Sequence, residues 1–198
     1  MYRFLIWILV LILPGKIFAQ ADAGIKLTTF SGHPFAKTDL DWHQKTIDGQ
    51  GYLTFEPGLS ADIYMPLINR VRIGAEVQAV SDRFNGFTGA VGINISGFVF
   101  KYWKNRLFIT IGPKLYVYQN RELPEDYTGD EGYKTEGAMP HKFMPLTGSI
   151  EYSYDLSKTT RFMVGLGQTH PKSAGITAGF RFILPAGGGK GCDCPSYR

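Results

Sequence analysis

Residues 71–80 read VRIGAEVQAV, and the alternation of their side chains decides the fold. The apolar set is Val71, Ile73, Ala75, Val77 and Ala79, and the polar or small set is Arg72, Gly74, Glu76 and Gln78. A period of two in side-chain direction is typical of a β-strand, and a strand with two such different faces needs two different surroundings. The stretch therefore predicts a strand that lies between an apolar and a polar environment.

The same alternation recurs along the chain. The predicted strands cover residues 25–30, 52–65, 71–80, 89–103, 107–118, 146–154, 160–167 and 174–184. Alternately short and mostly longer connections join them, which predicts an antiparallel meander with its short turns at one end and both termini at that end. Pro57, Pro113 and Pro145 fall inside strands and cannot donate a ladder hydrogen bond, so we expect a local bulge at each.

The composition favours β structure and excludes other classes. The 198 residues include 24 Gly, 11 Tyr and 14 Phe, but only 19% are charged. A net charge of +4 without a run of Lys or Arg gives no support for nucleic acid as a partner. After residue 20 no stretch reaches the roughly 18 apolar residues of a transmembrane helix, whereas a transmembrane strand needs only about 9 to 11 residues.

The N-terminus has the features of a signal peptide. Arg3 supplies a positive charge, residues 4–13 are apolar, and Ala19 and Ala21 give a small-x-small cleavage site. The apolar run is too short to cross a bilayer of about 30 Å as a helix. We expect a signal peptide over 1–19 with cleavage after 19 or 21, a barrel over 20–184, and a Gly-rich tail over 185–198.

The polar face of the predicted strands carries mostly small side chains, which indicates its direction. The small or short polar members are Gly58, Ser60, Gly74, Gly92, Asn94, Ser96, Gly112, Thr147, Ser149, Gly165 and Gly179. A surface exposed to water would carry more long polar side chains, whereas small ones fit the inside of a narrow eight-stranded barrel. We therefore expect the polar face to line the lumen and the apolar face to meet lipid.

The remaining charges on the polar face balance one another. Acidic Glu56, Asp62, Glu76 and Glu151 stand against basic Arg72, Lys114, Arg161 and Arg181, and Gln78 lies on the same face. Buried charges are costly unless they are paired, so these nine residues predict a polar network inside the barrel. On the apolar face near the short turns, a girdle of aromatic residues at a membrane interface is expected. Its members are Trp103, Tyr152, Tyr154, Phe162, Phe180 and Phe182.

With these features the mature sequence resembles the small outer-membrane β-barrel family of the OmpX type and the OmpA transmembrane domain. The resemblance lies in the strand pattern and the interior charges. It implies an all-β, eight-stranded antiparallel up-and-down transmembrane β-barrel in the outer membrane of a Gram-negative cell. It also implies a filled, non-conducting lumen and a structural or surface-interaction role. In this family an aromatic residue usually ends the chain, whereas residues 183–198 follow Phe182 here.

Two other functions are compatible with parts of the sequence. His170 and Ser173 resemble the His and Ser of outer-membrane lipid A deacylases, which implies a lipid-modifying enzyme in the same barrel. An eight-stranded lipocalin-like carrier, secreted and soluble, shows the same alternation with its apolar face inward. The spacing of His170 and Ser173 departs from the deacylase pattern, and Pro171 follows the histidine, which favours a protein that is not an enzyme.

No pattern predicts a catalytic, cofactor-binding or metal site. His33, Asp39, Asp41 and His43 lack a metal-ligand spacing, and residues 126–131 lack the ladder of a calcium loop. In the tail, Cys192 and Cys194 are too close for an easy mutual disulfide, which leaves intermolecular pairing, metal capture and free thiols open. The expected partners are outer-membrane lipid and an unknown extracellular partner that contacts loops 31–51 and 119–141.

Overall fold

A computed structural model describes most of the region between the predicted signal peptide and the tail. It describes residues 20–33, 47–48, 52–68, 70–81, 86–119, 141–171 and 173–185. Eight strands cover most of these residues. They are β1 (Gln20–Gly32), β2 (Leu53–Ile68), β3 (Val71–Ser81), β4 (Phe87–Tyr102), β5 (Asn105–Tyr118), β6 (His141–Asp155), β7 (Thr160–His170) and β8 (Ser173–Pro185). The predicted signal peptide and residues 186–198 lie outside the described residues.

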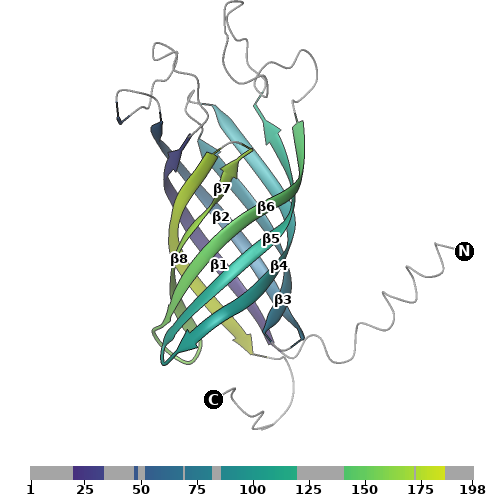
Figure 1. Ribbon diagram of the computed structural model, residues 1–198, viewed down its shortest axis with the longest axis vertical. Helices are drawn as coiled ribbons and strands as arrows, with labels where there is room; N and C mark the ends of the chain where they lie inside the picture. The colour runs from purple at the N-terminus through teal and green to yellow at the C-terminus, as the bar shows by residue number, and fades with distance from the viewer. Residues whose placement is uncertain are drawn as a thin grey trace, which may run out of the picture.

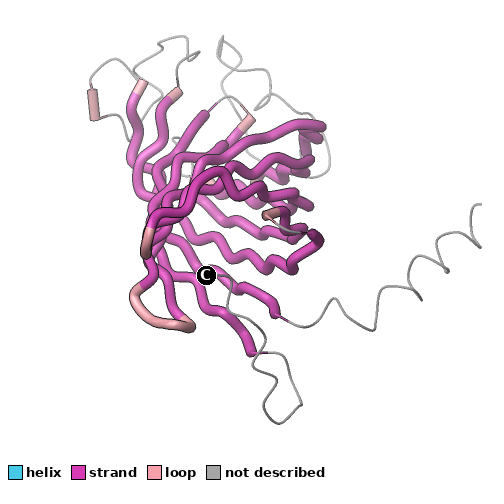
Figure 2. Tube along the Cα trace, turned by 60° about the horizontal axis from the view of Figure 1, so that its bottom comes forward, coloured by secondary structure: helices cyan, strands magenta, loops and turns pink. Residues whose placement is uncertain are grey.

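The strands form a closed antiparallel barrel in which each strand pairs with its neighbours in the sequence (Figure 1). Closure is made by β1, which pairs with β8 from Gln20 opposite Pro185 to Gly32 opposite Ala174. Figure 2 shows the described chain as strands and their connections. Among the described residues there is no helix with the length and apolar character to cross a membrane. The predicted eight-stranded up-and-down barrel is confirmed.

The strands are longer than the sequence pattern predicts. β1 begins at Gln20 instead of residue 25, and β6 begins at His141 instead of residue 146. β7 continues to His170, so the loop predicted over residues 168–173 is limited to 171–172. In a closed barrel each backbone group finds a partner on a neighbouring strand, and pairing continues beyond the point where apolar alternation fades.

The bulges expected at the three prolines are confirmed. The register between β1 and β2 shifts between Thr28 and Phe30, opposite the segment that contains Pro57. The register between β5 and β6 shifts across Pro113 and, on the opposite strand, across Pro145. At a shift in register the bulged residue lies outside the regular ladder, so no partner requires the amide hydrogen that proline lacks. The prolines therefore fit into a barrel that has no edge strand.

The connections divide the barrel into a short-turn end and a loop end, as expected. The connections β2 to β3, β4 to β5 and β6 to β7 are short and share one end with the start of β1 and the end of β8 (Figure 1). Two of these turns contain a residue in the left-handed region, Arg70 with φ of 68° and Trp103 with φ of 58°. Such a conformation is uncommon for residues other than glycine and fits a tight turn.

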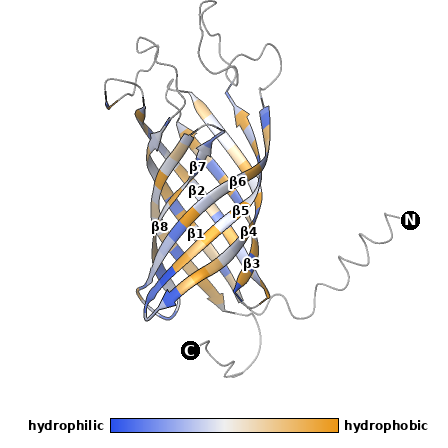
Figure 3. Cartoon of the chain, in the orientation of Figure 1, coloured by the Kyte–Doolittle hydropathy of each residue, from blue (hydrophilic) through white to orange (hydrophobic). Residues whose placement is uncertain are grey.

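The apolar side chains of the strands point outward. Figure 3 shows hydrophobic and hydrophilic residues alternating along the strands. Val77, on β3, is 54% exposed, whereas its neighbours in the polar set, Arg72, Gly74 and Gln78, are buried in the barrel. A soluble carrier of the lipocalin type needs the opposite arrangement. The alternative of a lipocalin-like carrier is therefore wrong.

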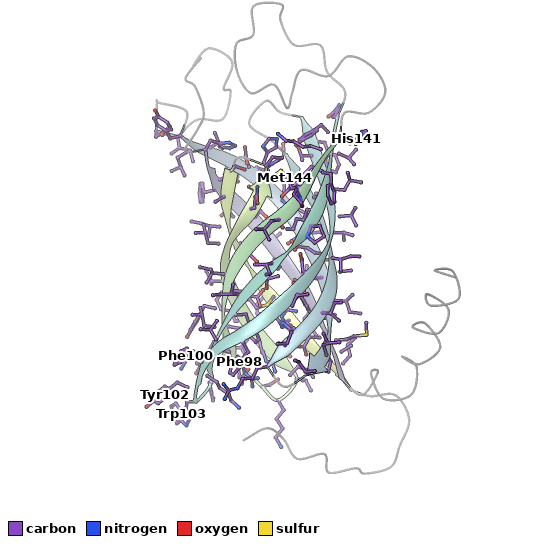
Figure 4. All side chains as sticks on the ribbon, turned by 45° about the vertical axis from the view of Figure 1, so that its right-hand side comes forward. Phe98, Phe100, Tyr102, Trp103, His141 and Met144 are labelled. Atoms are coloured by element: carbon purple, nitrogen blue, oxygen red, sulfur yellow. The ribbon has the colours of Figure 1, made fainter. Side chains whose placement is uncertain are left out.

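Aromatic side chains gather on the outside near the short-turn end. Figure 4 labels Phe100, Tyr102 and Trp103 there, and Trp103 is 85% exposed. The other predicted girdle residues are exposed at Tyr152, Tyr154, Phe180 and Phe182 and half-buried at Phe162. Their outward direction agrees with the sequence analysis, and their contact with a membrane interface stays a prediction.

Small residues leave room for large side chains inside the barrel. Gly74 lies opposite Tyr64 across β2 and β3, and a Cβ atom at Gly74 would collide with the Tyr64 ring and with the Ile63 carbonyl oxygen. The ring of Tyr64 is 3% exposed, so it fills the space that this glycine leaves. The glycines on the polar face thus serve to pack the lumen.

Candidate functional site

Five charged residues meet in the middle of the lumen, and we call them the central cluster. They are Lys26, Asp62, Arg72, Glu151 and Arg181. Each comes from a different strand, because every second residue of a strand points inward and the barrel brings strands far apart in the sequence face to face. The cluster therefore joins β1, β2, β3, β6 and β8 across the barrel.

Arg181 binds both carboxylates of this cluster. Its Nη1 lies 2.7 Å from Oδ1 of Asp62, and its Nη2 lies 3.1 Å from Oε2 of Glu151. Its side chain is fully buried, with an exposed fraction of 0%. A buried guanidinium is tolerated when carboxylates accept its hydrogen bonds, and this arrangement supplies two of them.

The other two cations share the same carboxylates. Nζ of Lys26 lies 2.7 Å from Oδ2 of Asp62 and 3.5 Å from Oε2 of Glu151. Nη2 of Arg72 lies 3.4 Å from Oε1 of Glu151. Glu151 is thus within ion-pair distance of all three cations. Because the carboxylates are shared, the loss of one charge would affect every other member of the cluster.

Aromatic rings pack against the cluster on the side of the short turns. The guanidinium carbon of Arg72 lies 4.3 Å from the ring centroid of Tyr64 and 4.0 Å from that of Phe108. The corresponding carbon of Arg181 lies 5.0 Å from the Tyr64 ring. Cations over ring faces are favourable, and the rings occupy cross-section that would otherwise be open.

A second polar group lies nearer the loop end. Nζ of Lys114 is 3.1 Å from Oε2 of Glu76, and Asn94 donates to the same oxygen at 2.9 Å. Gln78 donates to the backbone carbonyl of Thr169 at 3.2 Å. A cavity of about 30 Å³ lies between these residues and the central cluster, which is space for about one water molecule.

Arg161 belongs to a third group, at the short-turn end. It donates to Asp155 at 2.9 Å and to Asp22 at 3.3 Å. Arg106 also donates to Asp155, at 2.7 Å. These contacts place the predicted residue Arg161 below the central cluster and pair it with carboxylates that the sequence analysis left out.

The last predicted network residue, Glu56, lies at the loop end. Its Oε1 is 2.8 Å from Nε2 of His33, and both side chains are buried. The candidate enzyme residues His170 and Ser173 are buried at the same end and lie opposite each other between β7 and β8. Oγ of Ser173 lies 2.9 Å from Oγ1 of Thr169, and the His170 ring packs 5.3 Å from the ring of Tyr118.

The nine residues named from the sequence thus divide among several groups. Asp62, Arg72, Glu151 and Arg181 meet in the central cluster, Glu76, Gln78 and Lys114 lie above it, Arg161 lies below it, and Glu56 is at the loop end. Sequence reasoning missed Lys26 and Asp22. Lys26 alternates with Ile25 and Leu27, which was a signal for an inward position, whereas Asp22 precedes the predicted start of the first strand.

Other parts of the sequence also contain residue types that can bind metal ions. Among the described residues no group of three or more His, Cys, Asp or Glu side chains is placed to hold a metal ion. Asp39, Asp41, His43, residues 126–131, Cys192 and Cys194 lie outside the described residues.

Comparison with known proteins finds similarity in structure. No family model and no curated protein sequence matches the chain. A de novo designed transmembrane β-barrel matches with a TM-score of 0.50 and 5% identity, over 84% of this chain and 96% of that chain.

Two natural barrels are also similar. The N-terminal barrel domain of Pseudomonas aeruginosa OprF has a TM-score of 0.49 and 8% identity, over 84% of this chain and 98% of that chain. Yersinia pestis Ail, solved with the heparin analogue sucrose octasulfate, has a TM-score of 0.46 and 7% identity, over 83% and 98% of the two chains. The closed eight-stranded topology and the match to the designed barrel show that the chain has the fold of an eight-stranded transmembrane β-barrel.

Proposed function

We propose that this protein is an outer-membrane β-barrel of a Gram-negative bacterium with a filled, non-conducting lumen and a structural or surface-interaction role. The main support for a closed lumen is the central cluster, whose ion pairs cross the barrel between five strands. Eight strands leave an interior just wide enough for side chains to fill. Tyr64 and Phe108 occupy part of that interior beside the cluster.

Opening the lumen would require the central cluster to separate. Asp62 and Arg181 are both buried, and Glu151 is shared by three cations. Removing one partner from a buried ion pair costs about 3 to 5 kcal/mol, because the other charge is left uncompensated. A stable open pore is therefore an unfavourable state of this barrel.

Planar-bilayer recording tests the closed lumen. We expect the purified protein to insert without a steady conductance, because the central cluster blocks the path of ions. A 16-stranded porin, which has a water-filled channel, serves as a control for insertion and detection in the same bilayers. A steady open-channel current from the eight-stranded protein would contradict the proposal.

The surface role depends on the loop end facing the outside of the cell. The connections from β1 to β2 and from β5 to β6, predicted from the sequence as loops 31–51 and 119–141, are the longest in the chain, and loops on a rigid scaffold are where binding residues concentrate. We propose that they contact the extracellular partner, whereas the short turns face the periplasm.

Trypsin added to intact cells tests this orientation. We expect cleavage after Lys45 and Lys134, which lie in the two long loops, and protection of Lys104 and Lys158 in the short turns. Cells with a permeabilised outer membrane provide the control, since Lys104 and Lys158 should then be cut. Protection of all four sites in intact cells, or recovery of the protein in the soluble periplasmic fraction, would overturn the proposal.

A further inference from the structure

A basic cavity of about 550 Å³ lies at the short-turn end, below the central cluster. Five cationic side chains and one carboxylate among the described residues line it. They are Arg70, Arg72, Lys101, Arg106, Arg161 and Asp22. Asp155 and Glu151, outside this lining, pair with three of these cations, and the positive charge still exceeds the negative. This excess favours an anion, and the volume is that of a small-ligand pocket.

The barrel wall is incomplete beside this cavity. β3 begins at Val71, which pairs with Gly97, whereas β4 continues for five more residues to Tyr102. Beyond that pair, the Phe98 amide donates to the carbonyl oxygen of Arg70 at 2.8 Å. Residues 99–102 of β4 therefore extend past the end of β3, and residues 100–102 pair only with β5, which leaves a notch in the wall between β3 and β4.

Bulges on both sides make the notch apolar on its outer side. The register shifts between Pro66 and Ile68 on β2 and between Phe98 and Phe100 on β4. Ile68, which is 67% exposed, and Phe100 both point away from the lumen yet line the same cavity as the arginines. The cavity thus reaches from the cationic lumen to the apolar outer surface of the barrel.

Arg72 has unused hydrogen-bonding capacity at the inner end of the cavity. Within the described part of the chain, its Nε and Nη1 atoms are buried and have no hydrogen-bond acceptor, although Nη1 lies 3.5 Å from Oδ2 of Asp22. The rings of Tyr64 and Phe108 hold the guanidinium in place. Because both atoms are buried, a phosphate oxygen would reach them only if the Arg72 side chain shifts toward the cavity; it would then supply the missing acceptor, and arginine binds phosphate with charge-assisted hydrogen bonds.

We propose that the notch binds an anionic phospholipid, with its phosphate group among the arginines and an acyl chain against Ile68 and Phe100. A free phosphate ester would use only the cationic half of the cavity, whereas a lipid uses both halves. This inference rests on the proposed membrane location, because it requires lipid at the short-turn end.

Lipid retention by the purified barrel tests the proposal. The protein is extracted in detergent, incubated with phosphatidylglycerol or with phosphatidylcholine of the same chain length, and analysed by native mass spectrometry. We expect preferential retention of phosphatidylglycerol. The double variant Arg70→Gln, Lys101→Gln should lower that retention roughly tenfold, because each removes a cation near the membrane surface.

Matched variants separate this site from a general effect of charge. The control Lys104→Gln, Lys158→Gln removes two cations from the same end of the barrel that do not line the cavity, and it should retain the lipid normally. Equal retention by the two double variants would overturn the proposal. All variants are compared by heat-modifiable gel migration, and the exposed positions of the four residues favour normal folding.

A further arm distinguishes lipid from soluble phosphate. Phe100→Ser should weaken retention of phosphatidylglycerol and leave binding of glycerol 3-phosphate, followed by phosphorus NMR, unchanged. If glycerol 3-phosphate binds as tightly as the lipid, or if Phe100→Ser does not affect the lipid, the site is not a lipid site. The measurements use purified protein, so their failure is distinct from a failure of the protease test on cells.

Discussion

Glu151→Gln should destabilise the barrel by about 3 to 5 kcal/mol, as expected when one partner of a buried ion pair is removed. Glu151 lies within ion-pair distance of Lys26, Arg72 and Arg181. Without its charge, the three cations of the central cluster face a single carboxylate in it, Asp62. The measurement is a urea titration of unfolding in lipid vesicles, followed by the gel shift between folded and unfolded protein.

Two further variants show whether the effect comes from charge balance. Glu76→Gln makes the same chemical change in the lumen, but Glu76 contacts one cation, Lys114, and the amide of Asn94. We expect this control to be clearly less destabilised. The double variant Glu151→Gln, Arg72→Met restores the net charge of the central cluster and should recover part of the lost stability, because contacting residues are not additive. Additive losses would show that the cluster does not act as a group.

The central cluster illustrates how far sequence reasoning reached. Alternation was sufficient to assign Asp62, Arg72 and Arg181 to one face, because regular strands keep a period of two. It could not show that Arg181 binds Asp62, 119 positions away in the sequence. Which inward residues meet depends on strand tilt and stagger around a closed barrel, and neither is encoded in the period of one strand.

The balance of acidic and basic residues on the polar face did not predict which of them form ion pairs. Glu56 pairs with His33, and Arg161 pairs with Asp155 and Asp22, none of which was included in the predicted network. These partners lie at strand ends or beyond the predicted strands. At the strand ends the apolar alternation fades while the ladder of backbone hydrogen bonds continues. The strands predicted from the alternation were therefore shorter than the strands of the structure, and they did not include these partners.

Some of the bulges could be predicted from the sequence, and one on β4 could not. A proline within a strand indicates a bulge because it lacks an amide hydrogen. The sequence correctly predicted the bulges at Pro57, Pro113 and Pro145. The shift on β4 between Phe98 and Phe100 has no such residue. It arises where β4 continues past the end of β3, which is a property of two strands together. The notch proposed to bind lipid was therefore not predictable from the sequence.

Val77→Lys should cost roughly 2 to 4 kcal/mol of stability in lipid, the range measured for basic residues near the bilayer midplane on membrane barrels. Val77 is six residues from Val71 at the short-turn end of β3. With a rise of about 3.3 Å per residue and a tilt of about 40°, that is about 15 Å along the membrane normal, close to the middle of an apolar band about 25 Å tall. Leu156→Lys, in the exposed turn between β6 and β7, should have little effect.

Single cysteine labels at positions 77 and 78 test the same assignment without adding charge. In a background with Cys192 and Cys194 replaced by Ser, a fluorophore at Val77→Cys should be quenched by a quencher dissolved in the bilayer. A fluorophore at Gln78→Cys should be shielded from it, because Gln78 is buried in the lumen and donates to the Thr169 carbonyl. Adjacent residues of one strand point to opposite faces but lie next to each other along the strand. The two labels therefore have nearly equal depth and local flexibility and differ in the face that they occupy. Reversed quenching would therefore mean that the polar face is the outer one, and the outer-membrane location proposed for the barrel would be wrong.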